Sequence, residues 1–203
     1  MYSSAPLESN LLHPCHMRRL TRRAVFVCFI GGHTVTVLDP RTTQNGFFMR
    51  LMEKAYFHYK ADKGDPAPDE LEHTANILHK ADAFLVVSPE MNHTICPGLS
   101  NLMNYFGSSV YSKKPSGIAT YSAGPWGGAR CGVALRSYLS ELGCLPVSAT
   151  FQLPMAWRPN TFDGDGQLDS ETMAARSADK MMDQLEWHAR AMRAAREAGK
   201  EAP

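Results

Sequence analysis

The chain has 203 residues, 44% of them hydrophobic, and a formal net charge of +1. This length can bury a full core, and the near-neutral balance excludes the strong basic excess of a typical nucleic-acid binder. Five cysteines without paired spacing favour a reducing compartment over a disulfide framework, and no apolar run approaches the ~18 residues of a membrane span. We therefore expect a soluble cytoplasmic protein with no nucleic-acid or membrane partner.

The first 23 residues carry four arginines against a single acid, Glu8. We expect a flexible basic tail over 1–23, with organelle targeting as the alternative, because basic, serine-bearing N-termini are typical of transit peptides. His13, Cys15 and His16 could bind a metal. Without a fourth ligand nearby a solvated tail is preferred, and no metal site is expected.

Two strands are predicted next, because 24–30 is a continuous apolar run and 34–38 is rich in β-branched residues. A turn at 31–33 separates them. The stretch 41–64 carries many aromatic and apolar residues without a clean period. It either packs on the flank of the sheet or faces a cofactor or second subunit. A helix is predicted over 69–80, since Leu71, Ala75 and Leu78 share one face.

Two short apolar runs, 83–88 and 116–121, each end in a loop of unusual composition that a helical pattern follows. This repetition is typical of βαβ units around a buried parallel sheet. Ligands bind such sheets at the carboxyl ends of the strands. The loops 89–94 and 122–128 should therefore open onto one crevice.

The remaining pattern predicts helices over 97–106 and 128–142, a half-buried strand at 146–151 near the sheet edge, and a helix over 168–198. At about 1.5 Å per residue this last helix is longer than a small domain needs. Its end would offer a surface to a second subunit. The cluster Asp163-Gly164-Asp165-Gly166 is interpreted as a turn, because its spacing to a glutamate does not fit a calcium loop.

The stretch Pro89-Glu90-Met91-Asn92-His93-Thr94-Ile95, with Asn101-Leu102-Met103-Asn104 behind it, resembles the Pro-Glu-Tyr-Asn loop of the NADPH-dependent FMN reductase family. The stretch Ser122-Ala123-Gly124-Pro125-Trp126-Gly127-Gly128 is similar to that family's glycine-rich flavin loop. The resemblance implies an α/β, flavodoxin-like domain over 24–203. This domain would be a three-layer sandwich with a mostly parallel sheet that binds FMN without a covalent bond.

The resemblance also implies a function, an FMN-dependent NAD(P)H oxidoreductase with FMN and NADPH as cofactors. Hydride would pass from NAD(P)H through FMN to a small-molecule acceptor, namely a quinone, azo or nitro compound or a flavin. A homodimer or homotetramer is expected. The alternative is a non-catalytic flavodoxin-like interaction or oligomerisation protein that has lost tight FMN binding.

The cofactor-binding residues that the resemblance implies lie in the two loops: Pro89, Glu90, Met91, Asn92, His93, Thr94, Ser122, Ala123, Gly124, Pro125, Trp126, Gly127 and Gly128. The glycines would let the backbone approach a flat ring, and the helix that follows would stabilise charge on it. Asn92 either bonds the flavin edge or fixes the turn, and Trp126 either forms a wall or caps the core. His93 is interpreted as a wall, and no catalytic residue is assigned.

The chain departs from the family pattern at its start. The family's first strand is followed by a loop that holds the FMN phosphate and by a helix, and both are absent here, so the N-terminal strand-helix unit is incomplete. If 24–30 and 34–38 form a hairpin, the first strand fills its usual slot in reversed direction. Arg22 and Arg23 would then lie near the phosphate position, and FMN binding would be weak and salt-dependent. The alternative is that no hairpin forms and the arginines belong to a disordered tail.

Overall fold

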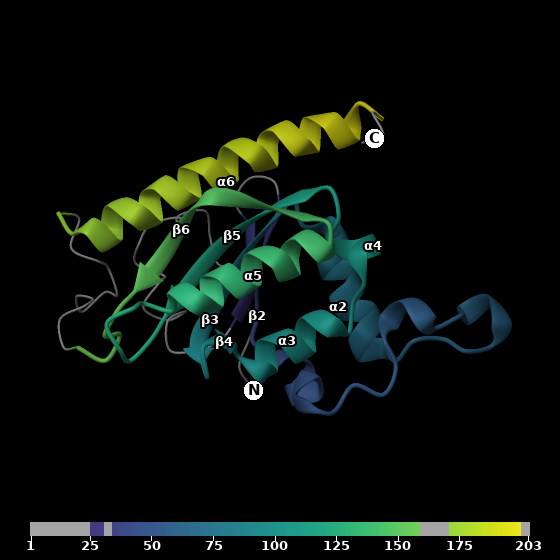
Figure 1. Ribbon diagram of the computed structural model, residues 1–203. Coiled ribbons are helices and arrows are strands. Elements are labelled where there is room, and N and C mark those ends of the chain that lie inside the picture. Colours follow the sequence, from purple (N-terminus) through teal and green to yellow (C-terminus); the bar gives the residue numbers. More distant parts are fainter. Residues whose placement is uncertain (1–24, 31–33, 159–170, 200–203) are drawn as a thin grey trace.

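The computed structural model describes residues 25–30, 34–158 and 171–199, and of 25–30 only the backbone (Figure 1). Its sheet has the strand order β2-β1-β3-β5-β6, with β4 paired to β3 outside this path. The strands are β1 Val25–Ile30, β2 Thr34–Leu38, β3 Ala83–Met91, β4 Thr94–Ile95, β5 Lys114–Tyr121 and β6 Cys144–Leu153. Apart from the inserted β4, this is the 2-1-3-4-5 order of flavodoxin-like folds.

The β1–β2 hairpin predicted for the N-terminal strands is confirmed. β1 pairs antiparallel with β2 on one side and with β3 on the other, whereas β3, β5 and β6 pair in parallel. The register Val25 to Val87 places the start of β1 beside the carboxyl end of β3. β1 therefore occupies the expected slot with its direction reversed. The turn 31–33 and the side chains of Arg22 and Arg23 lie outside the described residues.

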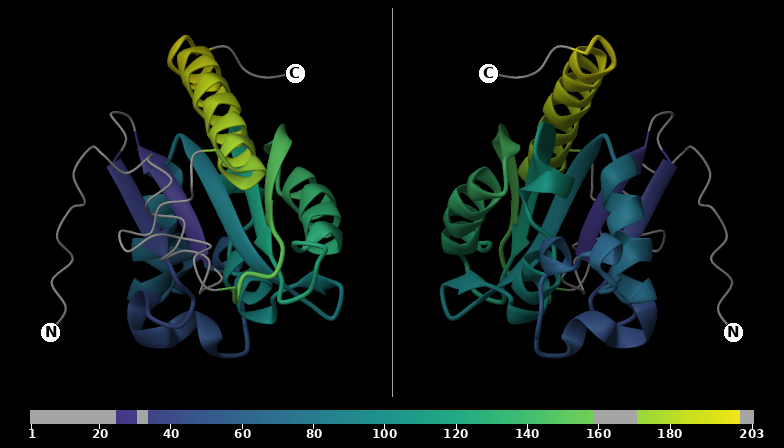
Figure 2. Two further views of the ribbon diagram at one scale, coloured as in Figure 1. Left: turned by 90° about the vertical axis from the view of Figure 1, so that its left-hand side faces the viewer. Right: turned by 90° about the vertical axis from the view of Figure 1, so that its right-hand side faces the viewer.

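Helices cover both faces of the sheet and complete three layers (Figure 2). They are α2 Asp69–Lys80, α3 Pro97–Asn104, α4 Ser108–Tyr111, α5 Ala129–Glu141 and α6 Met173–Glu197. β3 packs against both layers, since Phe84 and Val86 face the cluster under α2, α3 and α5, while Leu85 and Val87 face α6. This burial on both faces explains the continuous apolar run in its sequence. No helix in the described ranges combines the length and apolarity needed to cross a membrane.

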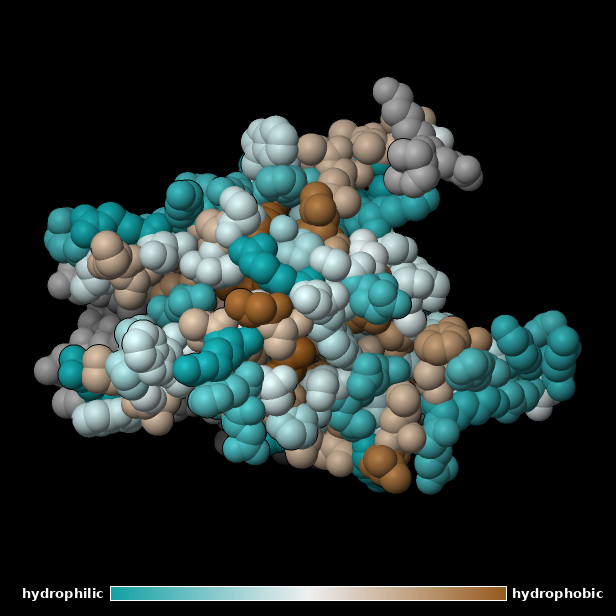
Figure 3. Space-filling model, viewed as in Figure 1, coloured by the Kyte–Doolittle hydropathy of each residue, from teal (hydrophilic) through white to brown (hydrophobic). Residues whose placement is uncertain are grey.

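The aromatic stretch 41–64 forms three short 3-10 helices, η2 Thr43–Met49, η3 Tyr56–His58 and η4 Ala61–Lys63. It packs on the flank of the domain, because Phe48 is fully buried against the rings of Tyr105 and Phe106. The end of this segment projects from the body of the molecule and is hydrophilic (Figures 1 and 3). The flank-packing interpretation is thus confirmed for its core-facing residues.

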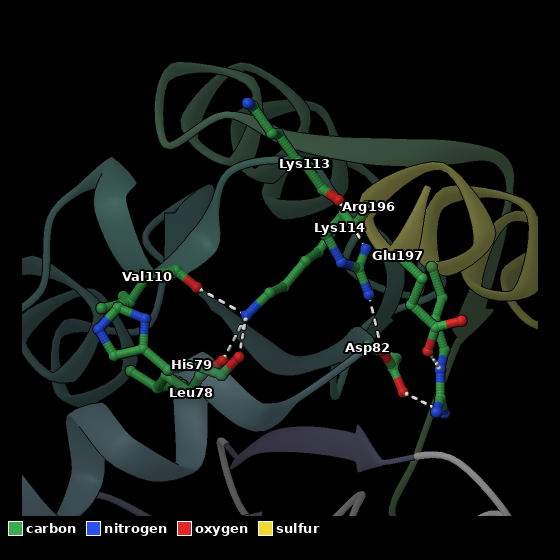
Figure 4. Close-up of polar contacts among 9 residues, drawn as sticks. Leu78, His79, Asp82, Val110, Lys113, Lys114, Arg196 and Glu197 are labelled. Atoms are coloured by element: carbon green, nitrogen blue, oxygen red, sulfur yellow. Dashed lines mark hydrogen bonds and ion pairs between the residues drawn. The ribbon is translucent and has the colours of Figure 1, made fainter. Parts of the chain in front are cut away.

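A polar network ties the helices to the sheet at the amino ends of the parallel strands (Figure 4). Arg196 of α6 donates to Asp82 Oδ1 at 2.6 Å and to the Lys113 carbonyl at 2.8 Å, and Arg193 donates to Asp82 Oδ2 at 3.2 Å. In the same region the buried Lys114 donates from Nζ to backbone carbonyls of α2 and α4. These bonds hold the helices to the sheet at this end. The two predicted loops lie at the opposite end, where the parallel strands have their carboxyl ends.

Candidate functional site

The first predicted loop is a β-hairpin at the carboxyl end of β3. The pair Met91–Thr94 closes it, and Asn92 and His93 form the turn with φ angles of 49° and 60°. Two central residues with positive φ define a type I′ turn, in which asparagine is favoured. Asn92 therefore fixes the turn, one of its two predicted roles, and His93 lies exposed at the tip.

Glu90 joins this hairpin to the second loop by capping α5. Its Oε2 accepts from the backbone N–H groups of Arg130 at 3.0 Å and Cys131 at 3.2 Å, and its Oε1 lies 3.6 Å from Arg130 Nη1. The N-cap residue of α5, Gly128, offers no side chain, so the carboxylate supplies the acceptor that the first turn needs. Glu90 therefore caps the start of α5, the helix end that was expected to face the flavin.

Gly127 and Gly128 pack the second loop onto the ends of β5 and β6. Both have positive φ, and an added Cβ would lie 3.1 Å from Leu153 N at Gly127 and 2.7 Å from Thr120 Cβ at Gly128. Thr120 Oγ1 also donates to the Gly127 carbonyl at 2.9 Å. These glycines allow close approach to the protein's own strands. Gly124 is different, because its Cβ would meet nothing within 4 Å.

The segment after β6 holds the second loop by backbone hydrogen bonds. Ser122 donates to Leu153 O at 3.2 Å, while Met155 donates to Gly124 O at 2.9 Å and Ala156 to Ser122 O at 3.0 Å. The indole Nε1 of Trp157 donates to the Ala123 carbonyl at 2.9 Å. Our sequence prediction did not include this segment. An isolated tryptophan soon after an edge strand was the signal that could have found it.

Each of the two loops exposes an apolar side chain. Trp126 is 66% exposed and Met91 is 46% exposed, so the alternative that Trp126 caps the core is wrong. The exposed run 123–126 carries no charge. This surface fits a flat, neutral ring such as that of a flavin.

A polar cluster lies at the same edge, at the end of β2. Asp39 is buried, and its carboxylate accepts from the Arg41 backbone at 2.9 Å and from Arg41 Nη2 at 3.3 Å. The Arg41 guanidinium is within electrostatic range of Tyr121, at the end of β5. Burial raises the pKa of Tyr121 to about 12, so its hydroxyl remains protonated at neutral pH. The edge thus offers a cation and a neutral hydroxyl donor beside the apolar surface.

Two thiols flank Ser88 where β3 leaves the core. The Ser88 hydroxyl accepts from the Cys96 backbone at 3.3 Å, and burial raises the pKa of the Cys131 thiol next to it. Among the described side chains, Cys96, Cys131 and Cys144 are free thiols. Within the described ranges no group of three His, Cys, Asp or Glu residues could hold a metal ion. His13, Cys15, His16 and the cluster 163–166 lie outside those ranges.

Comparison with known proteins identifies relatives of this chain. The sequence model of the family described as NADPH-dependent FMN reductase matches residues 16–158. A quinone reductase of Escherichia coli is 35% identical over 120 residues, which cover 58% of this chain and 64% of that protein. An NAD(P)H-dependent FMN reductase of Pseudomonas aeruginosa is 30% identical over 104 residues, 50% of this chain and 56% of that protein. The chain therefore spans less than two thirds of the length of these relatives.

Among solved structures, the flavoenzyme NAD(P)H:(acceptor) oxidoreductase FerB of Paracoccus denitrificans matches with a TM-score of 0.55 at 21% identity. The match covers 70% of this chain and 79% of that one. At this identity the likeness shows the fold, and it agrees with the strand order described above. The family match extends over well more than half of the sequence and includes both predicted loops. The chain belongs to the NADPH-dependent FMN reductase family.

Proposed function

We propose that this protein is an FMN-dependent NAD(P)H oxidoreductase that reduces small-molecule acceptors of the quinone, azo, nitro or flavin class. The observation that carries the proposal is that both loops at the carboxyl edge of the sheet present uncharged, exposed positions, namely Met91 in the first loop and Gly124 and Trp126 in the second. FMN, when bound, would supply the hydride chemistry between a nicotinamide and the acceptor.

The chain's own residues would bind and orient the ring. Met91 covers one side with its polarizable sulfur, Trp126 forms a wall, and Gly124 leaves room for close approach to the backbone. Tyr121 keeps its proton and can donate to an oxygen on the ring. Pro89, Asn92 and Thr94 shape the first loop, and Ser122 and Pro125 shape the second. No side chain is assigned a proton transfer.

The phosphate end of the cofactor is the weaker half of the proposed site. β1 enters the sheet at this edge instead of leaving it, so no described strand-to-helix turn follows β1 there. In place of that turn, the side-chain cations of Arg41, Arg22 and Arg23 would bind the phosphate. Arg41 is exposed and already paired with Asp39, so its attraction for a phosphate is modest and screened by salt.

Flavin binding tests the proposal directly. We expect the purified protein to bind FMN, with an affinity that falls as ionic strength rises, and to oxidise NADPH when an acceptor is added. Arg41→Gln should weaken FMN binding by about fivefold at most at low salt, since exposed ion pairs contribute ~1 kcal/mol or less. Fluorescence titration of FMN at low and high salt measures both effects.

The double variant Arg22→Ala/Arg23→Ala tests the phosphate end of the site. Arg22→Ala/Arg23→Ala should weaken binding at low salt if the reversed strand brings these arginines to the phosphate, and equal affinities would contradict that part. A colourless protein that cannot be reconstituted with FMN would reject the enzyme. It would support the second candidate, an interaction module, which the reversal of β1 favours because it removes the usual phosphate site.

We further propose that the protein assembles as a homodimer or homotetramer. Supporting this, the flank segment 41–64 exposes large apolar side chains, with Leu51 at 87% and Phe57 at 47% exposed. Exposed apolar groups of this size are typical of a surface that a partner covers. Light scattering at micromolar concentration should give at least twice the mass of one chain, and Leu51→Glu/Phe57→Glu should lower it. A wild-type monomer would contradict the proposal.

A further inference from the structure

Trp157 is an exposed aromatic side chain whose orientation the fold nevertheless fixes. It follows β6 at the carboxyl edge of the sheet, and 68% of it is exposed. Its indole N–H donates to the Ala123 carbonyl at 2.9 Å, which ties one edge of the ring to the second loop. The ring is therefore held in place while much of its surface faces solvent.

Stability does not require a tryptophan at this position. The backbone bonds of Met155 and Ala156 to the second loop already hold the segment, and a side chain this exposed buries little apolar surface. An aromatic ring with a satisfied N–H and free surface is suited to stacking, and its fixed orientation lowers the entropy cost of binding a ligand. These features indicate a binding role.

The residues around Trp157 indicate which class of ligand would bind there. The loop it contacts, Ser122 to Trp126, carries no charge, and neither does the stretch 154–156. The next residue, Arg158, is an exposed cation, but it already has an interaction partner. The contacted loop therefore favours a neutral planar ring over an anionic molecule, which would need unpaired cations. An electron-poor ring also stacks well on an electron-rich indole.

We propose that Trp157 is a stacking surface that binds the planar ring of a quinone-type electron acceptor beside the second loop. This inference rests on the proposed function, and it narrows the acceptor class to planar aromatic quinones. Trp157 acts as a positioning and specificity-determining residue: it holds the acceptor and exchanges no proton or electron.

Kinetics with two acceptors test the role. Trp157→Ala should raise KM for 1,4-naphthoquinone roughly threefold to tenfold, the range expected for one aromatic pair, and leave KM for NADPH unchanged. The rate with ferricyanide, which has no aromatic face, should not change. Trp157→Phe should keep much of the affinity. Trp187→Ala is the matched control, because Trp187 is also 68% exposed but lies on α6. An unchanged quinone KM, or a rise in KM for NADPH instead, overturns the proposal.

Fluorescence provides a second readout that does not depend on turnover. The chain has three tryptophans, so Trp126→Phe/Trp187→Phe leaves Trp157 as the sole emitter. Adding 1,4-naphthoquinone to the oxidised protein without NADPH should quench this emission to saturation, whereas Trp126→Phe/Trp157→Phe should show only linear, collisional quenching. Linear quenching of both overturns the inference. Saturable quenching in a protein that binds no FMN would reject the proposed enzyme and leave the acceptor site standing.

Discussion

Gly128→Val should unfold the protein or lower its free energy of unfolding by at least about 3 kcal/mol. Two costs add, because a β-branched residue would be forced to φ near +82° and its Cβ would lie 2.7 Å from Thr120 Cβ. A loss of this size is a large part of the ~5–15 kcal/mol that stabilises a typical domain. Urea unfolding followed by circular dichroism measures it.

Gly124→Val is the matched control in the same loop. Its Cβ would meet nothing within 4 Å, so we expect the urea midpoint to stay close to that of the wild type. FMN affinity should nevertheless fall, because the added side chain occupies the surface proposed for the ring. The pair separates the two roles of the loop. Wild-type flavin content in a folded Gly124→Val protein would remove Gly124 from the site, and a stable Gly128→Val protein would contradict the packing argument.

Lys114→Met should lower the free energy of unfolding by about 3 kcal/mol. The Lys114 Nζ donates to the carbonyls of Leu78 at 2.6 Å, His79 at 2.9 Å and Val110 at 3.1 Å (Figure 4). The first two are carbonyls of the last turn of α2, where a cation is favoured by the helix dipole. Methionine keeps the apolar stem but leaves these carbonyls without their charged donor, at about 1–3 kcal/mol for each buried one.

The neighbouring residue gives the control for this substitution. The Lys113 side chain is exposed and points away from the network, so Lys113→Met should change the free energy of unfolding by no more than about 0.5 kcal/mol (Figure 4). Chemical denaturation of the two variants side by side measures the difference. Equal midpoints would mean that water replaces Nζ at the three carbonyls.

Sequence periodicity predicted the helices and strands in which buried residues recur at regular spacing. α2 begins and ends where expected, and its buried Leu71, Ala75 and Leu78 are the residues that formed the predicted face. β3 runs three residues beyond its predicted end to Met91, because Pro89 pairs with β5 and the last two residues pair with β4. Local patterns therefore found the sheet and its helices, and tertiary pairing set the bounds.

The stretch 41–64 could not be predicted in this way. Its fold depends on Phe48, which is buried by Tyr105 and Phe106, more than fifty residues along the chain. Short 3-10 turns leave no hydrophobic period, since each spans too few residues to repeat one. Distant partners specify where this segment lies, both the aromatic rings and Asn101, whose amide donates to the carbonyls of Phe48 and Arg50.

The two predicted loops follow the carboxyl ends of the parallel neighbours β3 and β5, and so lie at one edge of the sheet as expected. That they bind the cofactor stays a prediction, and the contacts of single residues depend on distant parts of the chain. Glu90 was expected beside the flavin, which stays a prediction; the structure adds that its carboxylate accepts from amides that lie 40 and 41 residues later in the sequence. Arg41 entered the site through its position at the end of β2, which no motif marks. Such roles follow from tertiary neighbours that a single sequence does not display.

The reversed β1 strand also bears on how the chain folds. The hairpin of β1 with β2 closes locally, but the pairing Val25 to Val87 joins residues far apart in sequence, and an isolated hairpin is marginally stable in water. β3, with its almost wholly apolar side chains, therefore depends on a late-docking partner to cover its backbone edge. Until that partner arrives, β3 is open to pairing with another chain. Refolding yield should consequently depend on protein concentration more steeply than in flavodoxin-like proteins whose first strand is followed by its own helix.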